Sequence, residues 1–318
     1  MKAHLPAATG ARGLAFILAT AVAASAVAPE GESSGAHAVN LIRIDGAIGP
    51  ATASYVERAV RHATEGGARC LVVQIDTPGG LLDSTKEIVQ SFYGSEVPVV
   101  VYVAPTGAHA TSAGCIIALA ADVAAMAPHT SIGAAHPVEL GGTGEGKPDS
   151  IITKKLENFT VSYVEAIAAK RGRNVEWAAA AVRDSASVTA EKALDLKVID
   201  LIAPDLPSLL SQLEGREAGG VVLRTASARV VEIPRLARER VLQALWRPEV
   251  IFVLMLIAIY GIIGELSNPG AILPGVAGAI ALILAFYLAS ILPVSTAGLS
   301  LLALAVLLFV VDLFAPTH

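Results

Sequence analysis

Two kinds of apolar pattern alternate along the middle of the chain. Short apolar-rich runs have the length and composition of buried strands; they lie at 39–44, 70–75, 97–103, 123–127 and 198–202. Between and after them come stretches with helical spacing or helix-start signals, at 48–65, 82–92, 112–121, 150–171, 175–182, 189–194 and 206–213. Because strands and helices alternate, the sequence predicts an α/β domain with a mainly parallel sheet.

The first 38 residues have the pattern of an export signal. Lys2 and Arg12 supply positive charge, and an apolar region follows at 13–27. Ala-x-Ala cleavage patterns occur at 24–26, 26–28 and 36–38, and the proline at position 29 disfavours the second. An uncleaved anchor is the alternative interpretation. In both cases the domain that follows is expected to leave the cytoplasm.

The pattern changes after residue 215. Apolar runs at 221–223 and 230–233 are spaced like a β-hairpin, and 236–246 is a basic amphipathic segment suited to a membrane surface. Three apolar segments then follow, at 250–264, 271–292 and 297–314; the second is long enough to cross a bilayer and the others are near the lower limit. A buried helical hairpin is the alternative for this region.

These patterns divide the chain into four parts. They are a signal at 1–38, an α/β domain at 39–215, a hairpin and amphipathic linker at 216–247, and a membrane region of about three helices at 248–318. The loops between the apolar segments carry no Lys or Arg, so the exported domain rather than loop charge is expected to set the orientation.

Composition narrows the class of protein. Apolar residues make up 54% and charged residues 16% of the chain, a balance typical of membrane proteins. The net charge of −5 and the lack of a basic block argue against nucleic acid as a partner. Cys70 and Cys115 have apolar neighbours and are expected in the core. No zinc-ligand spacing or Gly-rich nucleotide loop occurs, so no metal or cofactor is expected.

Ser112 is the candidate nucleophile. It is a polar residue among small ones, between the strand at 97–103 and a buried helix at 116–121. Such a strand-to-helix turn can expose a hydroxyl beside the free N–H groups of a helix N-terminus. The Gly-x-Ser-x-Gly pattern of a nucleophile elbow is absent, and a helix-capping serine is the alternative interpretation.

A Gly-rich turn is expected beside this serine. The residues Asp-Thr-Pro-Gly-Gly at 76–80 follow the strand at 70–75, and the carboxyl ends of parallel strands share one edge of a sheet. The backbone N–H groups of Gly79 and Gly80, with that of Ala113, could hold an oxyanion. A plain turn is the alternative for this segment.

A serine nucleophile needs a base, and several side chains qualify: His109, His129, His136, Lys154 and Lys155. Lys154 shares a helix face with polar residues, whereas Lys155 is next to an apolar stripe and could turn toward the domain interior. A lysine in a low-dielectric site loses proton affinity and can act as a base. His136 needs no such shift, but no carboxylate is placed in the sequence to orient it.

Four motifs together resemble the NfeD family of membrane serine proteases, whose protease domain has the ClpP/crotonase fold. They are Asp-Thr-Pro-Gly-Gly at 76–80, Thr-Ser-Ala-Gly at 111–114, the segment 126–134, and Arg-Gly-Arg-Asn at 171–174. The segment 268–275 (Asn-Pro-Gly-Ala-Ile-Leu-Pro-Gly) is similar to the membrane part of the same family. The resemblance extends from about residue 39 to the C-terminus.

The resemblance implies a Ser-Lys dyad, and the family spacing places the lysine at Lys155. It also implies a homodimeric protease domain outside the cytoplasmic membrane, apolar stretches of membrane proteins as substrates in quality control, and a stomatin- or prohibitin-like partner. Longer family members continue into a further span and a small β-barrel of the OB type, which this sequence lacks. A natural short form and a truncated chain both account for that difference.

Three other functions fit parts of the sequence. A signal-peptide peptidase would share the fold and the dyad, but is expected to carry an N-terminal anchor rather than C-terminal spans. A crotonase-type enzyme would use an oxyanion hole without a nucleophile, but its CoA esters are cytoplasmic. A non-catalytic membrane scaffold for a stomatin-like protein needs no chemistry at all. Labelling of Ser112 by a fluorophosphonate separates enzyme from scaffold.

Overall fold

The computed structural model describes residues 38–137, 150–245, 248–267 and 272–291, with isolated positions between 298 and 308. The signal predicted at 1–38, apart from its last residue, lies outside the described residues. Residues 138–149 and most of the third apolar segment also lie outside them.

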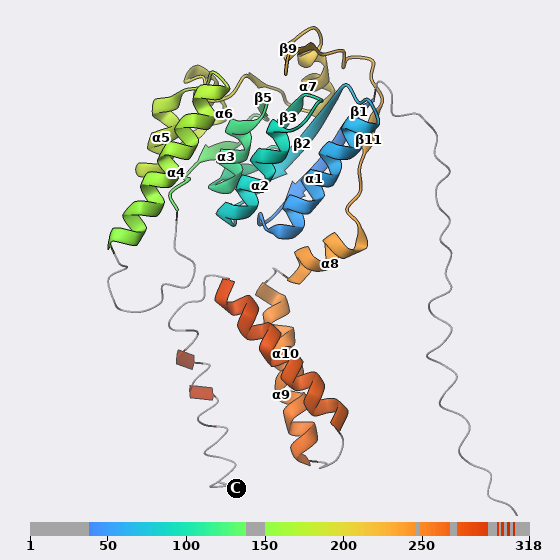
Figure 1. The fold of residues 1–318 in the computed structure, drawn as a ribbon, viewed down its shortest axis with the longest axis vertical. Coiled ribbons are helices and arrows are strands. Elements are labelled where there is room, and N and C mark those ends of the chain that lie inside the picture. Colours follow the sequence, from blue (N-terminus) through green and yellow to red (C-terminus); the bar gives the residue numbers. More distant parts are fainter. Residues whose placement is uncertain are drawn as a thin grey trace, which may run out of the picture. The chain divides into compact units, whose positions relative to one another are not determined.

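A parallel sheet forms the centre of the α/β domain (Figure 1). Its six strands are ordered β11-β1-β2-β3-β5-β8, and every neighbouring pair is parallel. The strands are β1 Val39–Asp45, β2 Cys70–Asp76, β3 Val99–Val103, β5 Val123–Met126, β8 Leu201–Ile202 and β11 Val230–Glu232. The predicted α/β fold with a parallel sheet is confirmed.

Helices cover both faces of this sheet. They are α1 Pro50–Glu65, α2 Leu82–Tyr93, α3 Ala113–Ala120, α4 Ser150–Lys170, α5 Val175–Arg183, α6 Ala190–Asp195 and α7 Leu206–Leu213. Alternate residues of β2 serve the two faces: Leu71 and Val73 pack in the cluster with α1 to α5, and Val72 packs with α7. Burial on both faces explains why the strands are almost wholly apolar.

A second, small sheet was not predicted. It consists of β4 His109–Thr111, β6 Ser131–Gly133 and β7 Ser187–Thr189, with β4 parallel to β6 and β6 antiparallel to β7. A bridge between Thr77 and Ala110 joins β4 to the chain that leaves β2. This small sheet supports the turn that precedes α3.

The predicted hairpin between 221–223 and 230–233 is wrong. Val221 and Val222 form β10, which pairs with β9 Glu217–Ala218 across a tight turn. Gly219 and Gly220 make that turn possible because both have positive φ. β11 instead extends the main sheet beside β1, where its backbone groups gain a longer partner.

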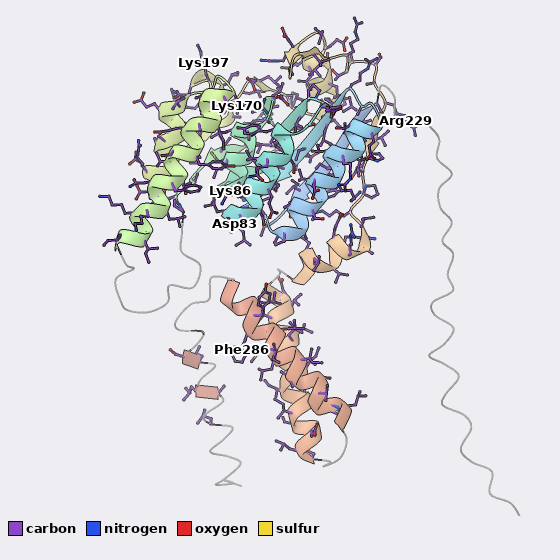
Figure 2. All side chains as sticks on the ribbon, in the orientation of Figure 1. Asp83, Lys86, Lys170, Lys197, Arg229 and Phe286 are labelled. Atoms are coloured by element: carbon purple, nitrogen blue, oxygen red, sulfur yellow. The ribbon has the colours of Figure 1, made fainter. Side chains whose placement is uncertain are left out.

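The C-terminal region begins with α8 Ala237–Leu245, followed by α9 Pro248–Ser267 and α10 Ile272–Ile291. Within the described residues, Glu249–Ser267 is long and apolar enough to cross a membrane, and Leu273–Leu288 is a shorter apolar stretch. α9 and α10 pack where Gly261 meets Gly278; a side chain at Gly261 would approach the Pro274 carbonyl oxygen to 2.5 Å. Large apolar side chains such as Phe286 face outward from the pair (Figure 2).

α8 is fastened to α1 by polar contacts. The buried Glu239 carboxylate accepts hydrogen bonds from Arg58, at 2.9 and 2.8 Å, and from the Leu236 N–H at 2.8 Å. Gln243 accepts from the Thr52 hydroxyl at 3.0 Å and donates to the Ala47 carbonyl oxygen at 2.9 Å. The linker helix is therefore part of the α/β domain's hydrogen-bond network.

The Glu239 contact makes this docking sensitive to acid. Burial by itself would raise the pKa of Glu239, but the bonds from Arg58 and Leu236 favour the carboxylate more, so the net pKa is lowered. A carboxyl whose pKa is lower in the folded protein stabilises it above the ordinary value of 4.5, and that contribution is lost as the pH falls further.

We therefore expect Glu239→Gln to lower the melting temperature at pH 7 and to reduce the further loss of stability below about pH 4.5. Thermal unfolding of the wild type and the variant at both pH values measures this difference. Glu57→Gln, which breaks an exposed ion pair with Arg61, is the control and should leave the pH dependence unchanged. Equal pH dependence for Glu239→Gln and the wild type would contradict the assignment.

Candidate active site

Ser112 has a strained backbone at the turn between β4 and α3. Its φ of 54° and ψ of −112° lie outside the regions that L-residues ordinarily adopt, at a cost of about 1–3 kcal/mol. The turn is held because the Ser112 N–H donates to Gly133 at 3.0 Å and its carbonyl accepts from Cys115 at 3.0 Å. A serine in a strained strand-to-helix turn is the geometry of a nucleophile elbow, although the sequence motif differs.

The Ser112 hydroxyl is not used to cap the helix. Ser112 stands at the N-cap position of α3, but its side chain makes no capping hydrogen bond and its φ is not that of an ordinary N-cap. Its side chain is partly exposed. Cys115, one turn further, is fully buried, and burial raises the pKa of its thiol to about 12. At this turn the hydroxyl of Ser112, not the thiol, is therefore available to a substrate.

The Gly-rich turn contacts Ser112, as the sequence predicts. Gly79 has a φ of +124°, and a Cβ placed there would lie 2.7 Å from the Ser112 Cβ. A Cβ at Gly80 would lie 2.0 Å from the carbonyl oxygen of Ile48. Both positions require glycine, the first for conformation and contact and the second for contact alone.

Thr77 organises this turn, a role that sequence reasoning missed. Its side chain is fully buried, and its Oγ1 accepts from the Gly79 N–H at 3.1 Å. Its methyl group lies against Gly114, where a Cβ would come within 2.5 Å. The glycine of Thr-Ser-Ala-Gly is thus required by the close packing of α3 on the Thr77 turn.

Two of the three predicted oxyanion donors remain uncommitted. Ala113 is the first residue of α3, so its N–H has no acceptor within the helix. No other acceptor for the N–H of Ala113 or of Gly80 is found in the part of the chain that the structure describes. The Gly79 N–H is occupied by Thr77. The geometry therefore favours Gly80 and Ala113 as the donors of an oxyanion hole.

The candidate histidines have other contacts. The His109 ring lies 3.1 Å from Asp76, which also accepts from the His109 backbone N–H at 3.0 Å. His129 is exposed in a turn with positive φ. The Nδ1 of His136 lies 2.8 Å from the Val182 carbonyl oxygen. A carbonyl can only accept, so this bond places a proton on Nδ1 and leaves Nε2 basic. The sequence argument considered only carboxylates, whereas the group that orients His136 is a backbone carbonyl.

Lys155 does not turn toward the domain interior, contrary to expectation. It is exposed, as are Lys154 and Phe159, and buried positions of α4 begin only at Thr160. The first half of α4 extends beyond the helices it packs on (Figure 1), and its side chains from Ile151 to Phe159 are exposed or half-buried. Among the described residues no hydrogen bond joins Lys155 to Ser112. Ile151, Lys154, Lys155 and Asn158 line one hollow of the surface, with a volume of about 420 Å³.

One contact does connect this part of α4 to the helix after the Gly-rich turn. The ammonium group of Lys86 lies 5.5 Å from the ring centroid of Phe159 and bonds to Asp83 at 3.0 Å. Figure 2 labels Asp83 and Lys86 on α2. Phe159 is thus in contact with α2 through the ammonium group of Lys86.

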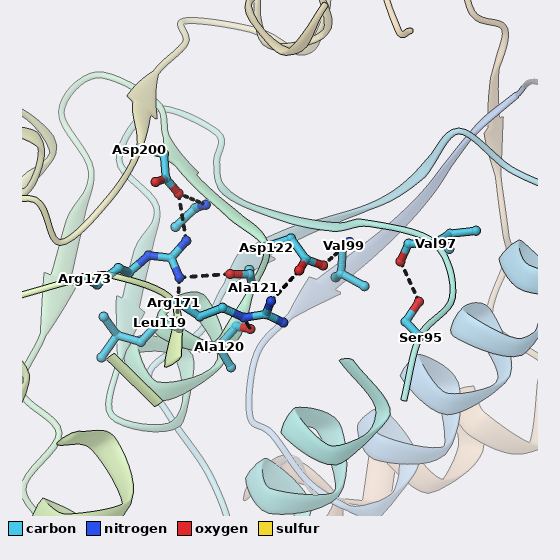
Figure 3. Close-up of polar contacts among 11 residues, drawn as sticks. Ser95, Val97, Val99, Leu119, Ala120, Ala121, Asp122, Arg171, Arg173 and Asp200 are labelled. Carbon is cyan, nitrogen blue, oxygen red and sulfur yellow. Dashed lines mark hydrogen bonds and ion pairs between the residues drawn. The ribbon is translucent and has the colours of Figure 1, made fainter. Parts of the chain in front are cut away.

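Arginines anchor the other end of α3 (Figure 3). Arg173 donates to the carbonyl oxygens of Leu119 and Ala121, at 2.8 and 2.9 Å, and to Asp200 at 2.7 Å. Arg171 donates to the Ala120 carbonyl oxygen at 2.7 Å and pairs with Asp122. Burial lowers the pKa of the Arg173 guanidinium, and Asp200 offsets part of that effect.

These bonds satisfy the last carbonyls of α3 with positive charge, as the helix dipole favours. The Asp122 carboxylate accepts from the backbone N–H of Val99, the first residue of β3. The Asp200 carboxylate accepts from the backbone N–H of Ala124, the second residue of β5. The two arginines therefore fix the helix that carries Ser112 to the amino edge of the main sheet.

Comparison with protein families places the chain. Residues 38–209 match the model of the NfeD1b N-terminal domain, and residues 249–318 match that of the NfeD integral membrane domain. The chain belongs to the NfeD family. The family resemblance drawn from the motifs is thereby confirmed, and with it an α/β domain joined to a membrane domain.

Two curated relatives are similar over most of this chain. It is 34% identical over 289 residues to membrane-bound protease PH1510 of Pyrococcus horikoshii and 29% identical over 294 residues to membrane protein NfeD1b of Bacillus subtilis. These alignments cover 88% and 87% of this chain, but 64% and 62% of the relatives. The chain thus spans less than two thirds of each relative's length.

Solved structures confirm the ClpP-like protease fold. A serine-to-alanine mutant of the 1510-N membrane-bound stomatin-specific protease has a TM-score of 0.58 at 33% identity, over 63% of this chain and 98% of that one. A lysine-to-alanine mutant of 1510-N in complex with a substrate peptide has a TM-score of 0.60 at 32% identity, over 66% and 98%.

We expect Gly80→Ala to damage the Gly-rich turn. The added methyl group cannot occupy the same space as the Ile48 carbonyl, so the variant should lose roughly 1–3 kcal/mol of stability. Displacement of the Gly80 N–H should also slow fluorophosphonate labelling by about 10²–10³-fold. Gly94→Ala is the control, because a Cβ there meets its nearest neighbour at 3.5 Å. Wild-type stability and labelling of Gly80→Ala would contradict the packing argument.

We expect Arg173→Met to destabilise the domain by about 3 kcal/mol, since it removes the guanidinium that donates to two helix carbonyls and to the Asp200 carboxylate. Thermal or urea unfolding measures this loss. Arg183→Met removes an exposed ion pair with Glu165 and should cost about 0–1 kcal/mol. Equal losses in the two variants would show that the Arg173 bonds do not stabilise α3.

Proposed function

We propose that this protein is a membrane-anchored serine endopeptidase with Ser112 as nucleophile and Lys155 as general base. The strained turn at Ser112, with an uncommitted hydroxyl against Gly79, is the observation that carries the proposal. The curated relative PH1510 is a membrane-bound protease, and the 1510-N structures include a serine and a lysine mutant. Those likenesses support a Ser-Lys dyad here.

The reaction follows from the residues at the turn. The Ser112 Oγ attacks a peptide carbonyl carbon while the neutral Lys155 amine accepts the hydroxyl proton. The oxyanion that forms accepts hydrogen bonds from Gly80 and Ala113. The C–N bond then breaks as the lysine returns its proton to the leaving amine. Water hydrolyses the acyl-enzyme by the same steps and restores the Ser112 hydroxyl.

Lys155 must leave solvent to act in this way. Ile151 and Phe159, at 61% and 46% exposure, lie on the same half of α4. Packing of this half against a second copy of the chain, as in the predicted homodimer, or against substrate would exclude water from the amine and favour its neutral form. The apolar exposure of this helix supports the dimer proposal.

The substrate class follows from the same likeness. The 1510-N protease is named as specific for a stomatin homologue. We infer that apolar segments of a stomatin- or prohibitin-like membrane protein are the substrates here, in membrane-protein quality control. A scaffold that binds such a partner without cleavage is the competing function, and the Arg58–Glu239 docking of the membrane linker fits either role.

We expect Ser112→Ala to abolish both peptide cleavage and fluorophosphonate labelling, by about 10⁴-fold or more, without a change in melting temperature. A protein that is labelled only when Ser112 is present is an enzyme. Folded wild-type protein that reacts with no fluorophosphonate would favour the scaffold.

The two adjacent lysines provide a matched comparison for the base. Lys155→Ala should be inactive, Lys154→Ala active, and His136→Ala impaired only moderately. Single-turnover cleavage of an apolar peptide measures all three. An inactive His136→Ala variant together with an active Lys155→Ala variant would assign the site to a Ser-His pair, for which His136 has a usable Nε2.

The protease domain is proposed to lie on the exported side of the cytoplasmic membrane, anchored by three spans. A reporter fused after Phe314 should then be cytoplasmic, and one fused after Gly215 should be exported. An exported reporter at both positions would mean that one of the three segments does not cross.

A further inference from the structure

Helix α8 has its polar side toward the protein and apolar side chains toward solvent. Glu239 and Gln243, four residues apart on one face, make the contacts to Arg58, Thr52 and Ala47. Val241 lies between them in sequence and therefore points away from that face. It is 61% exposed, and Leu242 beside it is 49% exposed. This is the reverse of the arrangement expected for a surface helix facing water.

Basic side chains flank these apolar ones. Arg238 and Arg240 are exposed and form no salt bridge among the residues that the structure describes. The acidic residue of this helix, Glu239, is turned inward and neutralised by Arg58. The outer side of α8 therefore offers apolar groups and positive charge together.

The chain itself places α8 next to the membrane. α8 ends at Leu245 and α9 begins at Pro248, so at most about 11 Å of extended chain separates them. The span Glu249–Ser267 starts one residue later. A helix this close in the chain to a membrane-spanning segment is within reach of the lipid headgroups, where an apolar side with adjacent arginines is stable.

We propose that α8 is an interfacial helix that binds an anionic bilayer. Val241 and Leu242 enter the boundary between headgroups and acyl chains, and Arg238 and Arg240 pair with lipid phosphates. Contacts on the inner side of α8 connect the helix to the Gly-rich turn beside Ser112. Gln243 holds the Ala47 carbonyl, and the next residue, Ile48, pairs with the backbone of Gly79 and Leu81.

A fluorophore at position 241 tests the proposal in the full chain. Val241→Cys is labelled with an environment-sensitive dye, since Cys70 and Cys115 are fully buried and will not react. The protein is reconstituted in vesicles of phosphatidylglycerol and phosphatidylcholine. Val222→Cys is the matched control, because Val222 is 54% exposed on β10 and far in sequence from the spans.

We expect nitroxide-labelled lipid to quench the dye at 241 and aqueous iodide to quench it several-fold less than the dye at 222. Iodide quenching as strong at 241 as at 222 would overturn the proposal, because α8 would then lie in water. Protection of the dye at 241 from both quenchers would also overturn it, since a protein surface would then cover the helix.

Lipid charge provides an independent arm. Arg238→Gln combined with Arg240→Gln should reduce nitroxide quenching at 241 in phosphatidylglycerol vesicles and leave it unchanged in pure phosphatidylcholine. Equal quenching with and without the arginines in the anionic vesicles would overturn the phosphate contacts. Neither measurement needs protease activity, so the result for α8 is independent of the proposed Ser-Lys dyad.

Discussion

The strained backbone of Ser112 is the constraint on which the rest of the domain depends. A residue with this φ and ψ costs stability and is kept only where its surroundings leave no other conformation. Gly133 holds it from the small sheet, Gly79 packs against its side chain, and Arg171 and Arg173 fix the far end of its helix. Together these contacts hold the turn in its strained conformation.

The amino and carboxyl ends of the main-sheet strands are held by different kinds of contact. At the amino ends, Asp122 pairs with Arg171 and Asp200 pairs with Arg173. These ion pairs join the strands to the helices. At the carboxyl edge, contacts between glycines and backbone groups leave N–H donors uncommitted beside Ser112. The ion-pair network at the amino ends thus stabilises the domain, whereas the carboxyl ends contain the strained turn and the N–H groups without acceptors.

Sequence patterns predicted the elements that have long apolar repeats. β1, β2 and α7 agree within one residue, because burial on a known face sets their composition. β4 and β6 were missed, since three residues paired outside the main sheet carry no periodicity. The predicted hairpin at 221–233 was wrong because the two apolar runs have similar composition but different strand partners: Val221 pairs with Ala218, and Val230 pairs with Val39.

The candidate site was predictable only in part. Contact between Gly79 and Ser112 follows from the shared edge of parallel strands. The role of Thr77 and the partner of His136 depend on tertiary packing that no local pattern records. The direction of Lys155 was wrong because an apolar stripe on α4 does not state whether this chain or another molecule covers it.

The placement of β11 has a mechanical consequence. β11 is the last strand before the membrane linker, and it runs parallel to β1 at the edge of the sheet. A pull on the chain that passed α8 and reached β11 would load the hydrogen bonds to β1 in shear, all at once, and would not break them one by one. Tyr55, whose hydroxyl bonds to the Ile233 carbonyl at 2.6 Å, adds a lock at the end of this strand. The β11–β1 ladder, the Tyr55 bond and the Arg58–Glu239 contact therefore all resist a pull on the chain between β11 and α9.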